Sequence, residues 1–243
     1  MAARVVVVTG ASRGIGRAVA ARFRADEDTV VVTGRDEATL TRTAEEVGAT
    51  AVRCDHTEPA DIRDLAAALT PGGVDVLVHC AGGNVDLQEP LPDEPTLEQV
   101  AERWRSNLDL NVVSAVLTTA ALKPAMRPGG SVVTVGSIGA EYAGSSYGAS
   151  KAALAAWTAG LSAELGAVGV SANTVSPGLV EETDFFHGRL SDERRARLVA
   201  ATHDGRAGTV DDIAETVFFL ASPGARHLTG QVLHVNGGAF TTR

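Results

Sequence analysis

The stretch that decides the fold is VVVVTGASRGIG, residues 5–16. Four consecutive valines predict a strand covered on both faces, because a strand that met water on one side would alternate apolar and polar residues. Gly10, Gly14 and Gly16 then allow a tight turn that opens a helix, where free N–H groups and the helix dipole attract a phosphate. The spacing is GxxxGxG and not the standard GxGxxG, so a glycine turn without a ligand stays open as the alternative.

Short apolar runs of this kind alternate with stretches of helical spacing along the rest of the chain. We expect strands over 5–8, 29–33, 50–54, 74–79, 131–135, 171–175 and 231–235, and helices over 14–24, 36–47, 59–69, 97–122, 147–165 and 210–221. This alternation predicts a Rossmann-like doubly wound parallel α/β sheet of about seven strands with helices on both faces. A ligand would lie at the carboxyl ends of the strands.

No repeat or linker divides the chain, so residues 1–243 are expected to form a single dinucleotide-binding domain. Two segments, 82–95 and 178–204, fit no regular element, apart from a helix-like piece at 191–201. Long loops in a compact domain are usually functional. We therefore expect a substrate lid at about 178–204.

Composition excludes several classes of partner and site. The formal charge of −9 argues against nucleic acid. Cys54 and Cys80 show no metal or redox spacing, and the six histidines form no ligand pair, so no metal is expected. The N-terminal apolar run is too short for a membrane span or a secretory signal. We expect a cytoplasmic protein with no membrane partner.

The end of the second predicted strand bears on the choice of dinucleotide. An acidic residue there would bind the ribose 2′-hydroxyl of NAD, whereas arginine favours the 2′-phosphate of NADP. Gly34 stands at that position and Arg35 follows it, while Arg13 lies inside the glycine turn. Two guanidinium groups favour NADP(H). The alternatives are that both arginines are solvated, and that Asp36 selects NAD.

The sequence YGASK, residues 147–151, combines two scarce residue types, since the chain has two tyrosines and two lysines. Tyr147 and Lys151 are four residues apart and would share a helix face. A phenol has a pKa of about 10, and a neighbouring ammonium would stabilise the phenolate and lower that pKa. The alternative is an exposed polar pair on a helix.

These motifs together resemble the short-chain dehydrogenase/reductase family, in its branch of bacterial 3-oxoacyl-acyl-carrier-protein reductases. The resemblance runs from about Arg4 to Ala239 through TGASRGIG, YGASK, Ser176-Pro177-Gly178 and the segment 205–238. It implies NADP(H)-dependent reduction of a ketone to an alcohol, with Tyr147 as proton donor and Lys151 lowering its pKa and binding the nicotinamide ribose.

The resemblance also implies further site residues. Ser137 would bind the substrate carbonyl, and Asn111, seven residues after Trp104, would hold a water that relays protons, with Asn107 as a rival. The implied cofactor contacts are Gly10, Ser12, Arg13, Gly14, Ile15, Gly16, Arg35, Asp55, His56, Cys80, Ala81, Gly82, Tyr147, Lys151, Pro177, Gly178, Val180 and Thr183. Asp55 and His56 match positions that contact adenine, and 177–180 matches the segment bordering nicotinamide.

The chain also departs from the family pattern. His79 and Cys80 stand where two asparagines are usual, and the loop 138–146 is about three residues short, which alters the substrate mouth. One extra residue precedes Thr183, which weakens its assignment as a carboxamide contact. Val168 replaces a basic residue that carrier-protein-acting relatives often have, so docking to an acidic carrier is doubtful.

The substrate itself is less defined by sequence. Apolar side chains of the expected lid and short loop predict an apolar pocket, although they could equally pack the lid on the domain; they are Tyr142, Phe185, Phe186, Leu190, Leu198 and Val199. A non-catalytic NADP(H)-binding regulator of the same fold is the competing function. The C-terminal strand and Asn236-Gly237-Gly238 resemble the family's subunit contact, which implies a homotetramer or homodimer.

Overall fold

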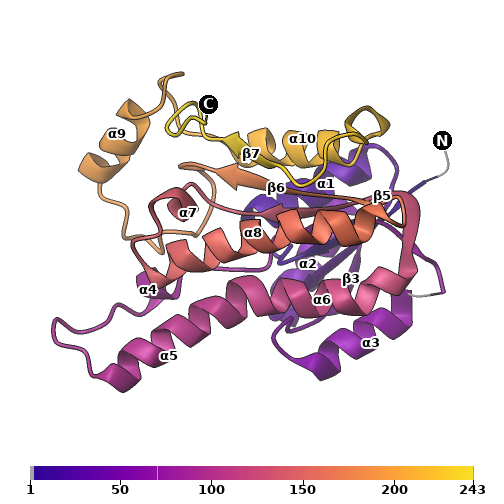
Figure 1. Ribbon diagram of the computed structural model, residues 1–243, viewed down its shortest axis with the longest axis horizontal. Coiled ribbons are helices and arrows are strands. Elements are labelled where there is room, and N and C mark those ends of the chain that lie inside the picture. The colour runs from indigo at the N-terminus through magenta and orange to yellow at the C-terminus, as the bar shows by residue number, and fades with distance from the viewer. Residues whose placement is uncertain (1–2, 70, 243) are drawn as a thin grey trace.

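The computed structural model describes residues 3–69 and 71–242. At its centre lies a parallel sheet of seven strands in the order β3-β2-β1-β4-β5-β6-β7, which confirms the predicted architecture (Figure 1). The strands are β1 Val5–Thr9, β2 Thr29–Gly34, β3 Thr50–Arg53, β4 Val74–His79, β5 Met126–Val135, β6 Ser171–Pro177 and β7 Val232–Val235. The order reverses between β1 and β4, where a crevice opens at the carboxyl ends of the strands.

Helices cover both faces of the sheet (Figure 1). They are α1 Gly14–Ala25, α2 Glu37–Val47, α3 Pro59–Leu69, α4 Val85–Gln88, α5 Leu97–Leu108, α6 Ser114–Leu122, α7 Gly139–Tyr142, α8 Ser146–Gly166, α9 Asp192–Ala200 and α10 Val210–Leu220, with short 3₁₀ turns at Lys123–Ala125 and Pro223–Ala225. Phe23 of α1 and Ile213 of α10 belong to the apolar core on one face of the sheet. Leu65 of α3 and Leu161 of α8 join the core on the opposite face.

Several elements differ from the sequence prediction, among them the short helix α7, which lies in the loop expected at 138–146. The helix expected over 97–122 is divided by a π-helical turn, Asp109–Val113, between α5 and α6. The segment 82–95, predicted to lack regular structure, contains the short helix α4. Strand β5 begins at Met126, five residues before the predicted start at 131.

The glycine turn after β1 is packed against the end of β4. Gly10 has a φ of +63°, and a Cβ there would lie 2.6 Å from the backbone of Ala81. A Cβ on Gly16 would lie 2.5 Å from the carbonyl oxygen of Gly10. Side chains at these positions would push α1 and β4 away from the turn, so the two glycines set the floor of the crevice. In the part of the chain that is described, no helix is long and apolar enough to cross a membrane.

Candidate active site

A cavity of about 670 Å³ lies at the carboxyl ends of the strands. Its lining includes every site residue that the sequence predicted except Asn111: Gly10, Ser12, Arg13, Gly14, Ile15, Gly16, Arg35, Asp55, His56, Cys80, Ala81, Gly82, Ser137, Tyr147, Lys151, Pro177, Gly178, Val180 and Thr183. Segments from all along the chain thus meet at one place.

The N-terminus of α1 faces this cavity in a form suited to an anion. Within the described residues, the N-cap residue Arg13 makes no capping hydrogen bond with its side chain, and the first turn of α1 holds no acidic residue. The first backbone N–H groups of α1 are therefore open to a phosphate group. A Cβ on Gly14 would meet only Thr183, at 3.6 Å or more, so this glycine leaves room above the turn. The site fits a dinucleotide pyrophosphate.

Arg13 and Arg35 both line the cavity, but Arg13 already has a partner. Its guanidinium nitrogen lies 2.7 Å from the carboxylate of Asp184, and both side chains are more than half exposed. Asp36, the residue weighed as a selector of NAD, accepts a hydrogen bond from the backbone N–H of Thr39 and so caps α2. A phosphate bound at Arg13 would compete with Asp184 for the guanidinium.

The two predicted adenine contacts differ in their availability. Asp55 lines the cavity, and although burial raises the pKa of its carboxyl, hydrogen bonds from Thr57 and the charge of Arg35 lower it overall. The side chain of His56 instead is buried, with Nε2 2.6 Å from the hydroxyl of Thr33 and Nδ1 2.7 Å from that of Thr118. Because both ring nitrogens are engaged, an adenine contact from His56 would have to come from its backbone.

His79 and Cys80 fill the positions where the sequence lacks the expected asparagines. The Nε2 atom of His79 lies 2.8 Å from the hydroxyl of Thr119, and its ring packs edge-on against Trp157. Cys80 lines the cavity, and burial raises the pKa of its thiol to about 12, so the sulfur is a neutral thiol. His79 therefore makes a buried hydrogen bond at this position, and Cys80 adds an unreactive neutral group.

Ser137 and Tyr147 come together from the end of β5 and the start of α8. Burial raises the pKa of the Tyr147 phenol to about 12, and a hydrogen bond with Ser137 lowers it only in part. The sequence led us to expect that Lys151 would lower this pKa; instead the pKa is raised, because desolvation dominates in a residue that is only 8% exposed. At neutral pH the phenol carries its proton, as a proton donor must.

The side chains of Lys151 and Asn111 both lie close to Gly82. A Cβ on Gly82 would lie 2.7 Å from Asn111 Oδ1 and 3.2 Å from Lys151 Nζ. Lys151 Nζ donates to the carbonyl of Val135 at 2.9 Å, and burial lowers its pKa to about 8. Asn111 lies in the π-helical turn, and its amide binds both the N–H and the carbonyl of Gly83, at 3.1 and 2.9 Å.

The side chain of Asn107, the alternative to Asn111, forms hydrogen bonds with a different set of residues. Its Nδ2 atom donates to Asp86 Oδ1 at 3.0 Å and to the Ser146 hydroxyl at 2.8 Å. Asp86 also accepts from the Ser146 hydroxyl, at 2.8 Å, and from the backbone N–H of Tyr147, at 3.4 Å. Asn111 and Lys151 thus both lie close to Gly82, whereas Asn107 and Asp86 hold the first turn of α8.

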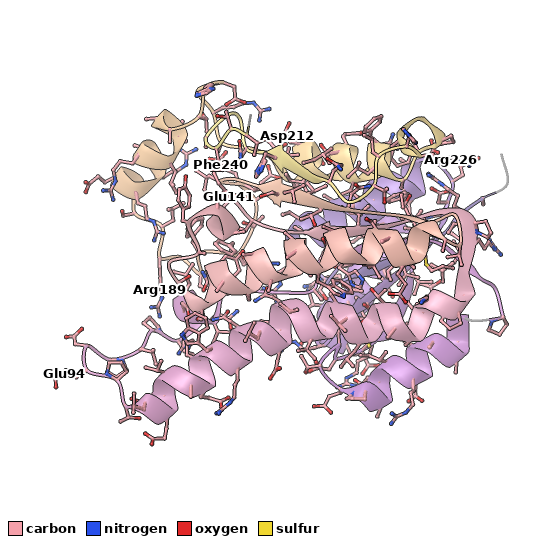
Figure 2. The ribbon with its side chains drawn as sticks, viewed as in Figure 1. Glu94, Glu141, Arg189, Asp212, Arg226 and Phe240 are labelled. Atoms are coloured by element: carbon pink, nitrogen blue, oxygen red, sulfur yellow. The ribbon has the colours of Figure 1, made fainter. Side chains whose placement is uncertain are left out.

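The other end of the cavity is mainly apolar. Tyr142, Phe185, Phe186 and Leu198 line it, as the sequence predicted, whereas Leu190 and Val199 are not in the lining. The C-terminal residues reach the same region: Phe240 packs on Tyr142 and on His234, whose Nε2 lies 3.7 Å from Glu141 (Figure 2). The tail therefore braces α7, the helix that follows Ser137.

Comparison with known proteins identifies the family. A family model described as enoyl-(acyl carrier protein) reductase matches residues 10–240. The 3-oxoacyl-acyl-carrier-protein reductase of Escherichia coli (strain K12) is 33% identical over 246 residues, which cover 98% of this chain and 97% of that protein. The chain belongs to the short-chain dehydrogenase/reductase family. The corresponding reductase of Vibrio cholerae (strain El Tor Inaba N16961) is 34% identical over the same shares of both chains.

Solved short-chain dehydrogenase/reductase structures show the same fold, and some contain a cofactor. A short chain dehydrogenase from Burkholderia cenocepacia J2315 in complex with NADP superposes with a TM-score of 0.85 at 29% identity, covering 98% of this chain and 97% of that one. A blue fluorescent protein from a metagenomic library in complex with NADPH gives a TM-score of 0.84 at 34% identity, covering 98% of both chains. The chain is thus an oxidoreductase-family protein with NADP-bound structural relatives.

Several residues of the short-chain dehydrogenase/reductase site were missed by sequence reasoning. Asp184, Gln88 and Arg194 line the cavity, and Asp86 supports the turn that carries Tyr147. Asp184 and Arg194 lie in the segment 178–204, which the sequence singled out as a whole without marking these charges. Among the residues that are described, no group of three His, Cys, Asp or Glu side chains is placed to hold a metal ion.

Proposed function

We propose that this protein reduces a ketone, either a 3-oxoacyl compound or another small carbonyl compound, to an alcohol with NADPH. The observation that carries the proposal is the meeting of Ser137, Tyr147 and Lys151 on one cavity whose other half presents an open helix N-terminus and two arginines. NADPH, when bound, supplies the hydride. The remaining chemistry is assigned to side chains of this chain.

Ser137 orients the substrate carbonyl and donates a hydrogen bond to the oxygen as it gains negative charge. Tyr147 gives its phenolic proton to that oxygen; with a pKa of about 12 the phenol carries its proton at neutral pH. Lys151 binds the nicotinamide ribose. Asn111 holds a water that returns a proton through Lys151.

The cofactor contacts follow the lining of the cavity. The N-terminus of α1 and residues 10–16 bind the pyrophosphate, and Arg13 and Arg35 bind the 2′-phosphate of NADP(H). Asp55, the backbone of His56 and residues 80–82 border the adenosine, while residues 177–180 and Thr183 border the nicotinamide. Thr183 lies over Gly14 of the pyrophosphate turn, so it stays close to the proposed cofactor path despite the extra residue before it.

The surroundings of the site complete the proposal. Residues 1–243 act as one dinucleotide-binding domain, and the segment 178–204 closes over the substrate as a lid. The protein works in the cytoplasm as a homotetramer or homodimer, with a small-molecule ketone or alcohol as its partner and no nucleic acid or membrane. Multi-angle light scattering tests the oligomeric state, and a monomer at working concentrations would contradict it.

The decisive experiment is a panel of ketones followed by the absorbance of NADPH, repeated with NADH. We expect turnover of at least one ketone, with kcat/KM for NADPH above that for NADH because of the two arginines. A clear preference for NADH would overturn the cofactor assignment. Tight NADPH binding without turnover of any ketone or alcohol would favour the non-catalytic regulator and overturn the enzyme proposal.

A further inference from the structure

A row of aromatic rings leads from Tyr147 to a cation on α9. The ring of Tyr147 lies 5.4 Å from that of Phe185, which lies 5.0 Å from that of Phe186. The guanidinium carbon of Arg194 stands 5.4 Å from the centre of the Phe186 ring. All four residues line the cavity, and α9 lies at the end of the molecule where α4 and α7 also lie (Figure 1).

The charged side chains that line the cavity differ in whether they have a partner. Its three carboxylates are engaged: Asp36 caps α2, Asp55 accepts from Thr57, and Asp184 pairs with Arg13. Arg194 lines the same cavity and, over the described ranges 3–69 and 71–242, forms no ion pair. In a chain of net charge −9, the aromatic end of the cavity therefore presents an unneutralised guanidinium.

We propose that the substrate carries an anionic group, a carboxylate or a phosphate, separated from its reacting carbonyl by an apolar or aromatic body, and that Arg194 binds this group. The inference rests on the proposed function, since it takes the carbonyl to lie at Tyr147 and Ser137. The body of the substrate lies along Phe185 and Phe186, whose rings offer a flat apolar surface. Arg194 then fixes the far end.

The chemistry of the guanidinium suits this role. Arginine presents planar paired donors that match the oxygens of a carboxylate or phosphate, and its charge strengthens these hydrogen bonds. Stacking on Phe186 holds the guanidinium at the cavity and leaves its N–H edge free for a ligand. Because Arg194 is carried by α9, binding of the anion also draws this helix toward the substrate.

The neighbouring arginine provides a matched control. Arg195 follows Arg194 on α9 and is also exposed, but it pairs with the carboxylate of Glu181 and is not in the lining of the cavity. If an exposed arginine on α9 acted only through the overall charge of the helix, both residues would have the same effect. The proposal requires that they differ.

The test uses pairs of related ketones, of which one member carries an anionic group and the other does not. The first pair is 4-acetylbenzoate and its neutral methyl ester, and the second is acetoacetyl-coenzyme A and the neutral acetoacetyl thioester of N-acetylcysteamine. KM and kcat are measured with NADPH for the unchanged protein, Arg194→Gln and Arg195→Gln. Equilibrium binding of the four compounds to the NADPH complex of Tyr147→Phe gives a readout that does not depend on turnover.

We expect the unchanged protein to favour the anionic member of at least one pair, and Arg194→Gln to raise its KM about tenfold, as expected for the loss of one charge-assisted hydrogen bond. In Arg194→Gln, the KM for the neutral member and the KM for NADPH should change by less than about twofold. In Arg195→Gln, the KM for the anionic member should also change by less than about twofold. The pair that responds shows whether the anion is a carboxylate or a phosphate.

Equal use of charged and neutral partners by the unchanged protein, or equal effects of the two substitutions, would overturn the proposal. If no ketone oxidised NADPH while an anionic compound still bound more tightly than its neutral partner, the proposed function would fall and the anion site would stand. If neither turnover nor charge-dependent binding was observed, both would fall.

Discussion

Two buried histidines near the cofactor cavity predict a loss of stability in mild acid. Burial lowers the pKa of His56 to about 4 and that of His79 to about 3, and the two rings also repel each other when charged. Both rings are held in place by hydrogen bonds with threonine hydroxyls. In the unfolded chain a histidine has a pKa of about 6.5.

The sign and size of the effect follow from proton linkage. As pH falls below about 6.5, the unfolded chain takes up protons that the folded protein does not, so the unfolded state gains stability by about 1.4 kcal/mol per pH unit for each histidine. At pH 5 each histidine thus costs about 2 kcal/mol relative to pH 7.5, or about 4 kcal/mol together. That is a large part of the typical 5–15 kcal/mol of folding stability.

The assay is urea unfolding at several pH values between 5 and 7.5, with the free energy of unfolding extrapolated to water. The double variant His56→Gln, His79→Asn should flatten this pH dependence by about 4 kcal/mol even if its stability at pH 7.5 is lower. His227→Gln, which alters an exposed histidine, is the control. An unchanged pH dependence in the double variant would refute the reasoning.

Three further predictions concern the cofactor and the catalytic group. Asp184→Asn should lower the KM for NADPH about two- to fivefold and leave the KM for NADH unchanged, because the substitution frees Arg13 from an exposed ion pair. Steady-state kinetics with both cofactors checks this prediction. A KM shift shared by both cofactors would count against it. Lys151→Arg should reduce kcat at least about a hundredfold, since a guanidinium cannot replace the compact ammonium beside Asn111 and Val135, whereas Lys123→Arg, at a surface pair with Glu164, should be neutral. Gly82→Ala should abolish turnover, because its Cβ would come within 2.7 Å of Asn111 Oδ1, and near-normal kcat would show that the Asn111–Lys151 juxtaposition is dispensable.

Most of the fold could be predicted because the signals that specify it are local. The valine runs of β1 and β2 and the glycines of the turn have the same meaning in any chain, and their positions agree with the structure. The π-helical turn at Asp109–Val113 was missed because apolar periodicity continues through it. Its wider turn allows Asn111 to bind Gly83, a contact across 28 residues that no local pattern encodes.

Site residues of scarce types could be predicted from the sequence, whereas site residues of common types could not. Tyr147 and Lys151 stood out because the chain has so few tyrosines and lysines. Arg194 did not, because its sequence neighbour Arg195 has the same local character and only the fold directs one of them to the cavity. The burial of His56 between Thr33 and Thr118 likewise depends on contacts between distant segments.

The central claim is that the phenol of Tyr147 donates the proton, and the most direct measurement is the turnover of Tyr147→Phe with a ketone that the unchanged protein reduces. The account predicts a fall in kcat of about a hundred- to ten-thousandfold, the usual range for loss of a general acid. The equilibrium dissociation constant for NADPH should stay within about twofold of that of the unchanged protein, since Arg13, Arg35 and the N-terminus of α1 are untouched. Near-native turnover by Tyr147→Phe would contradict the account.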